Sequence, residues 1–109
     1  MAVDLDKVRG ALGRKRQEIE AESALAADAR ETVELDQQSV GRLSRMDAMQ
    51  AQAMAQAQER RRQNELARIE LALRRIDAGD YGYCTQCDDE IAPGRLEIDP
   101  MAERCIKCA

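Results

Sequence analysis

Four cysteines near the end of the chain form the pattern with the most definite chemistry. They make two C-x2-C pairs separated by seventeen residues: Cys84, Cys87, Cys105 and Cys108. This spacing is typical of a four-thiolate zinc site, in which two short loops bring sulfur ligands to the corners of one tetrahedron. Four thiolates leave no corner for an activated water molecule. The pattern therefore predicts one structural Zn²⁺ and no catalytic metal.

A thiol redox switch is the alternative use of these cysteines, although no βαβ pattern of the kind that carries redox C-x2-C motifs surrounds them. The chain begins Met1-Ala-Val-Asp, without the basic and apolar regions of a signal peptide. It also lacks the run of ~20 apolar residues that a membrane span needs. We expect a cytoplasmic protein with no membrane association, and a reducing compartment favours a metal site over disulfides.

Composition limits the fold that can hold the cysteines. The chain has 109 residues, no Phe, Trp or His, and only Tyr81 and Tyr83 as aromatics. It is too short and too poor in large apolar side chains to bury a large core. With 35% charged residues and a net charge of −4, it has no overall basic field for non-specific nucleic-acid binding.

Apolar periodicity predicts two long helices, at about residues 4 to 35 and 43 to 77. The first has apolar residues at intervals of seven: Leu5, Leu12, Ile19, Ala26 and Val33. The second has an apolar stripe near its end: Leu66, Ile69, Leu73 and Ile76. An Ala, Gln and Met run at 48–57 supplies strong helix formers between its ends. The predicted fold is mainly α.

The two helices can be paired by arithmetic, since facing residues of an antiparallel pair have numbers with a constant sum. Leu12 with Leu66 gives 78, and Val33 with Met46 gives 79. We therefore predict an antiparallel coiled-coil hairpin at 1–78, with its tip at about 36–42, and a C4 zinc-finger module at 79–109. At 1.5 Å per residue each helix is roughly 50 Å long. A homodimer of two long helices is the alternative, and the break at Gly41 favours the monomeric hairpin.

The module itself has few apolar residues. Gly79 is a natural helix stop, and residues 91–100 alternate so that Leu96 and Ile98 would share one face of a short strand or hairpin. So small a core needs metal binding for most of its folding free energy, which structural zinc supplies on the order of 10 kcal/mol or more.

A dense run of residues in the last third of the chain carries a family resemblance. It reads Leu73-x-x-Ile76-Asp-x-Gly79-x-Tyr81-Gly82-x-Cys84-x-x-Cys87, then Ile91, Arg95-Leu96-Glu97, Pro100 and Cys105-x-x-Cys108. Over about residues 66 to 108 the chain resembles the DksA/TraR family of RNA polymerase-binding regulators. The resemblance implies a coiled-coil hairpin that enters the secondary channel of bacterial RNA polymerase and changes promoter-complex stability without DNA contact. It implies a ligand of an enzyme and not an enzyme.

The resemblance also implies a functional tip, where the family has an Asp-x-x-Asp-x-Ala pattern. The matching positions here are Asp36, Ser39 and Gly41, so only the first aspartate is kept. Asp47 could supply the second carboxylate if the hairpin turns later. The alternative for Asp36 is a helix-end residue that hydrogen-bonds the backbone. A single tip carboxylate makes a metal-chelating transcript-cleavage enzyme the least favoured interpretation.

Two further function classes stay open: a zinc ribbon that contacts nucleic acid, and a structural helical adaptor. The basic run Arg60-Arg61-Arg62 is interleaved with Glu59 and Glu65 at intrahelical spacings, which favours a solvated face. No aromatic residue for base stacking lies along it. Family members that respond to guanosine tetraphosphate carry a basic residue where this chain has Asp99, whereas Arg68 keeps a basic side chain on the second helix.

Overall fold

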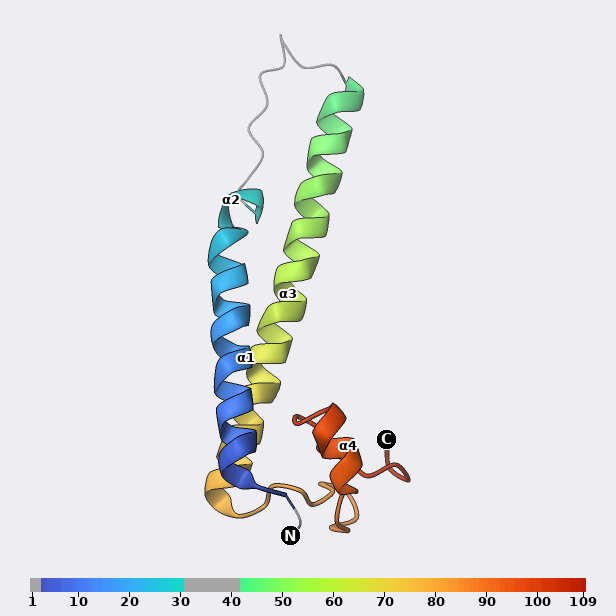
Figure 1. The fold of residues 1–109 in the computed structure, drawn as a ribbon. Coiled ribbons are helices and arrows are strands. Elements are labelled where there is room, and N and C mark those ends of the chain that lie inside the picture. Colours follow the sequence, from blue (N-terminus) through green and yellow to red (C-terminus); the bar gives the residue numbers. More distant parts are fainter. Residues whose placement is uncertain (1–2, 31–41) are drawn as a thin grey trace. The chain divides into compact units, whose positions relative to one another are not determined.

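The computed structural model describes residues 3–30 and 42–109, and this part of the chain is helical without a strand. Its helices are α1 (Leu5–Leu25), α2 (Ala27–Arg30), α3 (Arg42–Ala78) and α4 (Pro93–Ile98). They are coloured along the sequence in Figure 1. The predicted mainly α fold, a helical hairpin followed by a four-cysteine module, is confirmed. The predicted tip at 36–42 lies outside the described residues, except for Arg42, where α3 begins.

The helix prediction is right for α3 and wrong for the first helix. Asp4 caps α1, since its Oδ1 accepts hydrogen bonds from the N–H groups of Asp6 at 3.0 Å and Lys7 at 3.3 Å. The continuous helix expected from 4 to about 35 is interrupted, because α1 ends at Leu25 and Ala26 lies in a turn before α2. Ala26 is itself a strong helix former, so nothing in the local sequence signals this break.

The chain divides into two compact units, which are described one at a time. Unit 1 comprises Met1–Gln17 and Glu65–Ala109. It holds the beginning of α1, the end of α3 and the cysteine module. Its buried apolar side chains come from all of these segments: Leu12, Ile69, Ala72, Ile76, Tyr81, Ile91, Leu96, Met101 and Ala102. The helix ends and the module therefore belong to the same compact unit, and the predicted division at 78 and 79 stays a prediction.

Unit 2 comprises Glu18–Asn64. Among its described side chains only Ile19 is buried, whereas the large apolar side chains of Leu25, Met46, Met49 and Met54 are exposed. The seam between the helices is as thin here as the sequence predicts. Polar contacts must therefore supply a larger share of the specificity with which α1 and α3 pair in this unit.

Three ion pairs join α1 to α3 within unit 1: Arg9 with Asp77 at 2.9 Å, Lys15 with Glu65 at 3.0 Å and Arg16 with Glu70 at 3.7 Å. They confirm antiparallel pairing, but each pair of residue numbers adds to more than the expected 78 to 79. Helical side chains lean toward the N-terminus of their own helix, so contacting residues lie further along both helices than a level pair does. The arithmetic ignored that lean. All three pairs are solvent-exposed and contribute little stability.

The strand expected within 91–100 is wrong. Residues Pro93–Ile98 form α4, with Pro93 in the first turn, where its fixed φ suits a helix and its missing N–H is not needed. Residues two apart on a helix point in nearly opposite directions. Leu96 is accordingly 2% exposed and Ile98 88% exposed, so they do not share a face.

The core of unit 1 can be tested with two leucine substitutions. Leu12 is 1% exposed and Leu71, in the same unit, is 44% exposed. We expect Leu12→Ala to lower the free energy of unfolding by about 2–5 kcal/mol, because it removes buried methyl groups and leaves a cavity. Leu71→Ala should cost less than about 1 kcal/mol. Urea denaturation followed by circular dichroism measures both, and equal losses would contradict the described packing.

Candidate metal centre

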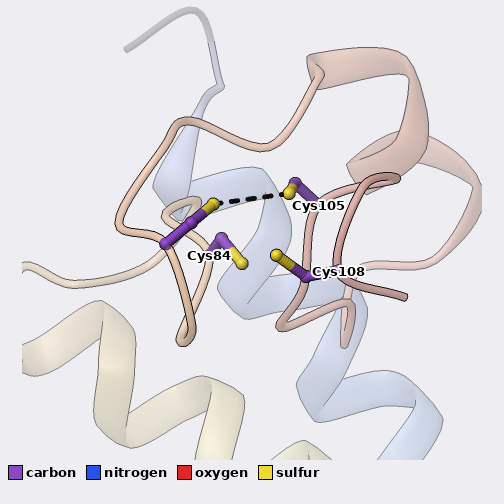
Figure 2. A group of neighbouring side chains, drawn as sticks. Cys84, Cys105 and Cys108 are labelled. Carbon is purple, nitrogen blue, oxygen red and sulfur yellow. Dashed lines mark hydrogen bonds between the residues drawn. The ribbon is translucent and has the colours of Figure 1, made fainter.

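The four predicted cysteines are brought together in unit 1. Their sulfur atoms all lie within 4.8 Å of one another, and the Sγ atoms of Cys87 and Cys105 are 3.5 Å apart. Figure 2 shows the sulfur atoms of Cys84, Cys105 and Cys108 turned toward a common centre. A tetrahedral Zn²⁺ with Zn–S bonds of about 2.3 Å places its sulfur ligands about 3.8 Å apart. The cluster therefore fits a zinc ion in both ligand type and spacing.

The end of α3 delivers the chain to the first cysteine pair. Gly79 has φ of 81° and its N–H bonds the carbonyl of Ile76 at 3.2 Å, while the N–H of Asp80 bonds the carbonyl of Arg75 at 2.8 Å. These two bonds form a Schellman motif, which requires the left-handed conformation that glycine adopts without strain. The predicted helix stop is confirmed. The chain leaves α3 in a fixed direction, five residues before Cys84.

The first cysteine loop is closed by backbone hydrogen bonds. The N–H of Asp88 bonds the carbonyl of Cys84 at 3.0 Å, and the N–H of Cys84 bonds the carbonyl of Asp89 at 2.8 Å. Tyr83 and Glu90 then form an isolated antiparallel bridge. Asp88 has φ of 62°, a left-handed conformation that aspartate tolerates better than most residues but less well than glycine. The loop thus holds its shape at a small cost in strain.

The second cysteine loop is built the same way. The carbonyl of Cys105 accepts hydrogen bonds from the N–H groups of Cys108 and Ala109, both at 3.0 Å. The two loops are joined directly by a bond from the N–H of Thr85 to the carbonyl of Glu103 at 2.9 Å. Cys84 and Cys105 are buried, while Cys87 and Cys108 are partly or fully exposed. Each pair therefore contributes one inner and one outer sulfur.

The electrostatics of the cluster are those of thiols that share one small volume. Backbone N–H groups, of Cys105 first and of Cys87 next, lower the pKa of the Cys84 thiol to about 6. Contacts with the neighbouring thiols, Cys105 first, raise the pKa of Cys108 to about 12. Ionising one thiol thus opposes ionising the next. A bound divalent cation offsets that repulsion and favours the thiolate form of its ligands.

Two side chains whose roles the sequence did not predict support the module through hydrogen bonds to its backbone. The guanidinium group of Arg75 donates hydrogen bonds to the carbonyls of Asp80 and Tyr83, which ties α3 to the chain just before Cys84. The buried hydroxyl of Tyr81 donates to the carbonyl of Pro100 at 2.8 Å. Burial, followed by the charge of Asp99, raises the pKa of this phenol. In the sequence, Arg75 is one of several arginines of α3, so no local pattern distinguishes it or identifies its role.

The other predicted site residues are placed only in part. Asp47 is exposed on α3, and Asp36, Ser39 and Gly41 lie outside the described residues. Arg68 pairs with Asp99 at 3.4 Å, so the basic side chain on α3 meets the acidic residue before Pro100. Arg74 pairs with Glu70 along α3 on a solvated charged face, as predicted, whereas the side chains of Arg62 and Glu59 pair where only 20% and 17% of them are exposed. None of the described helices combines the length and apolarity that a membrane crossing needs.

Comparison with known proteins shows which proteins share this cysteine cluster. The family model of the prokaryotic dksA/traR C4-type zinc finger matches residues 79–109. The RNA polymerase-binding transcription factor DksA of Haemophilus influenzae is 44% identical over 43 residues, which are 39% of this chain and 30% of that protein. DksA of Escherichia coli strain K12 is 42% identical over 43 residues, 28% of its length. The match thus spans less than a third of these curated relatives.

The structural comparison extends further along the chain. The structure of transcription factor DksA2 from Pseudomonas aeruginosa matches with a TM-score of 0.74 and 27% identity, over 95% of this chain and 78% of that one. The fold and the cluster define a class, helical hairpins followed by a four-cysteine zinc finger. Within that class, residues 79–109 match the DksA/TraR zinc finger, and the chain over 95% of its length is similar in structure to DksA2.

Strain at Asp88 gives a prediction about the metal centre. Asp88→Gly removes the side chain from a left-handed position, and we expect the protein to keep zinc up to about tenfold longer against a chelator. Asp89→Gly is the control, since Asp89 does not have positive φ. Asp89→Gly should leave the time for which zinc is retained unchanged or shorten it, because the substitution only increases the conformational entropy of the unfolded loop. Release measured with a colorimetric zinc indicator decides, and equal lengthening by both would contradict the strain.

Proposed function

We propose that this chain is a DksA/TraR-like transcription regulator that binds bacterial RNA polymerase, with its helical hairpin in the secondary channel. The observation that carries the proposal is the likeness to DksA2 over 95% of the chain, which includes the hairpin as well as the zinc finger. The curated relatives bear the name RNA polymerase-binding transcription factor. Such a regulator would act on an enzyme and perform no catalysis of its own, and it would work in the cytoplasm, where bacterial RNA polymerase is.

The part of the hairpin that would approach the polymerase active site carries the proposed contact residues Asp36, Ser39, Gly41 and Asp47. Asp47 supports this assignment because it is exposed near the beginning of α3. The regulator would act as a monomer and without sequence-specific DNA contact. The net charge of −4 supports the second point, since phosphate binding needs a concentrated positive charge.

The zinc-finger module at 79–109 would hold one structural Zn²⁺ on Cys84, Cys87, Cys105 and Cys108, beside the hairpin at 1–78. Four thiolates would complete the tetrahedron, so the ion would be closed to substrate. The module has few buried side chains of its own, and several of them pack within the same unit as the ends of α1 and α3. Metal binding would thus hold together a module that apolar burial stabilises only weakly.

Binding to polymerase can be tested with an aspartate substitution at the proposed contact. We expect the wild-type protein to be retained by immobilised core RNA polymerase and to shorten or lengthen the life of promoter complexes in transcription with purified components. Asp36→Asn should weaken that effect about tenfold, the value of one lost charge-assisted contact. Asp77→Asn is the control, because it makes the same chemical change in unit 1. Failure of the wild type to bind would overturn the proposal.

Zinc removal tests the structural role separately. A strong chelator should abolish the tertiary order of residues 79–109, because metal binding is folding free energy for a module of this size. Much of the helical circular dichroism signal should remain, since α1 and α3 hold most of the helical residues. Elemental analysis should give one zinc per chain before chelation. Retained protection of the module from proteolysis after complete zinc loss would contradict a structural role.

A further inference from the structure

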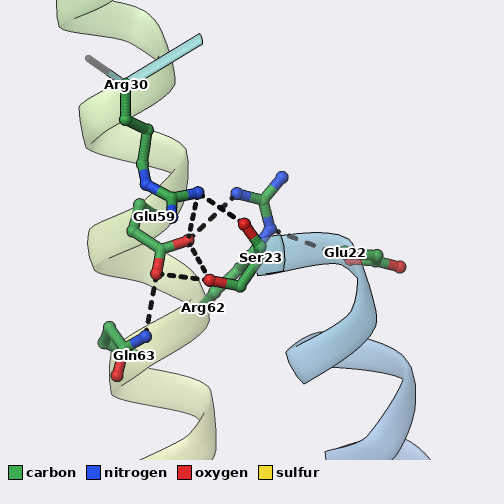
Figure 3. A network of polar contacts seen from close by, with 6 residues as sticks. All are labelled: Glu22, Ser23, Arg30, Glu59, Arg62 and Gln63. Atoms are coloured by element: carbon green, nitrogen blue, oxygen red, sulfur yellow. Dashed lines mark hydrogen bonds and ion pairs between the residues drawn. The ribbon is translucent and has the colours of Figure 1, made fainter. Parts of the chain in front are cut away.

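The carboxylate of Glu59, on α3 in unit 2, is the centre of a polar network that the proposed function does not explain (Figure 3). Ser23 Oγ lies 2.9 Å from its Oε1 and 2.7 Å from its Oε2, and Gln63 Nε2 donates to Oε2 at 2.8 Å. The guanidinium groups of Arg30 and Arg62 lie 3.2 Å and 3.3 Å from Oε1. Only 17% of the Glu59 side chain is exposed. One carboxylate therefore meets donors from α1, α2 and α3.

The charges of this network favour an ionised Glu59. Hydrogen bonds from Gln63 first and Ser23 next, aided by Arg62 and the charge of Arg30, hold the pKa of Glu59 below its ordinary value. Among the described residues, Glu22 of α1 also faces the cluster, at 3.9 Å from Arg62, and it is 64% exposed. Arg30 and Arg62 thus share the half-enclosed carboxylate of Glu59, and Arg62 also faces the solvated carboxylate of Glu22. Removing the charge of Glu59 leaves Arg30 and Arg62 close together with little to neutralise them.

The network lies at the interruption of the first helix. Arg30, the last residue of α2, donates from Nη1 to the carbonyl of Ser23 at 2.8 Å as well as pairing with Glu59. The last carbonyls of a helix have no partner inside it, and Ser23 is in the last turn of α1. The side chain of Arg30 therefore folds back over the break at Ala26. Glu59 holds both Ser23, on the near side of the break, and Arg30, on the far side.

We propose that Glu59 is a positioning residue that fixes α2 at the end of α1, with Arg30 and Ser23 as the groups it holds. Unit 2 offers little else for this purpose, because Ile19 is its only buried apolar side chain among those described and Leu25, beside the break, is 87% exposed. Resting on the proposed function, Glu59 then contributes to regulation through this positioning and not by contact with polymerase, because donors of the chain itself already surround its carboxylate.

The positioning can be measured with amide hydrogen exchange at residues 27–30. Glu59→Gln keeps the shape of the side chain but replaces an acceptor oxygen with a donor and removes the charge. We expect exchange at these amides to become about tenfold faster or more. Glu22→Gln, the matched control on the exposed rim of the network, should change exchange less than about twofold. Equal acceleration by the two variants, or none by Glu59→Gln, would overturn the proposal.

A double-mutant cycle shows whether Arg30 is the group through which Glu59 acts. Arg30→Gln alone should accelerate exchange at residues 27–30. The double variant with Glu59→Gln should accelerate exchange by less than the product of the two single-variant factors. Independent, multiplicative effects would mean that Glu59 only supports general stability. The carboxyl carbon resonance of Glu59 gives a second readout: its titration midpoint should lie below the ordinary glutamate value and rise in Arg30→Gln. A midpoint at the ordinary glutamate value would contradict the network.

The regulatory part is tested in transcription with purified polymerase and the full chain. Glu59→Gln should bind polymerase within about twofold of the wild type but change promoter-complex lifetime about tenfold less. Weakened binding in proportion to the lost effect would identify Glu59 as a contact residue and overturn its positioning role. If the wild type itself neither binds nor affects polymerase, the proposed function and this regulatory part fail together, while the exchange and titration experiments still decide the positioning.

Discussion

The convergence of four cysteine sulfurs is the constraint on which unit 1 depends. Two loops far apart in sequence must meet within 4.8 Å, and the chain between them contributes one short helix, α4. Three features bring the loops toward each other: the Schellman turn after α3, the hydrogen bonds that Arg75 donates to the chain after that turn, and the Thr85 to Glu103 bond between the loops. These contacts therefore offset part of the conformational entropy that is lost when the site becomes ordered. A shared cation can supply the folding free energy that apolar packing cannot supply in so small a module.

The two units solve the same pairing problem with different interactions. In unit 1, Leu12, Ile69 and Ile76 are buried between elements, and the exposed ion pairs around them add little. In unit 2, apolar burial nearly disappears and the half-enclosed network of Glu59 takes its place. Local opening free energies follow the density of buried contacts. The alanine and glutamine run of α3 thus lies in unit 2, where a single polar cluster has the most influence on the local opening free energy.

Much of this could be predicted from the sequence, and what could not has a physical reason. The spacing of the cysteines follows from the geometry of a metal site, and the extent of α3 follows from its apolar period. Both signals can be read from short stretches of sequence. The break at Ala26 is a tertiary effect, since Arg30 and Glu59 stabilise it although alanine favours helix. The strand expected at Leu96 and Ile98 failed because alternation over so few residues does not separate a strand from a turn of helix; Pro93, which suits a helix start, was the signal to use.

Salt should separate the two kinds of charged contact. Arg9, Asp77, Arg16 and Glu70 have side chains that are 43% to 65% exposed, and mobile ions screen such pairs at physiological ionic strength. Glu59, Arg62 and Arg30 have side chains that are 17%, 20% and 23% exposed, so they interact at short range with less water between them. Screening acts weakly on such partly buried pairs. The network that holds α2 should therefore depend less on ionic strength than these exposed pairs, although it lies in the unit with the smaller apolar core.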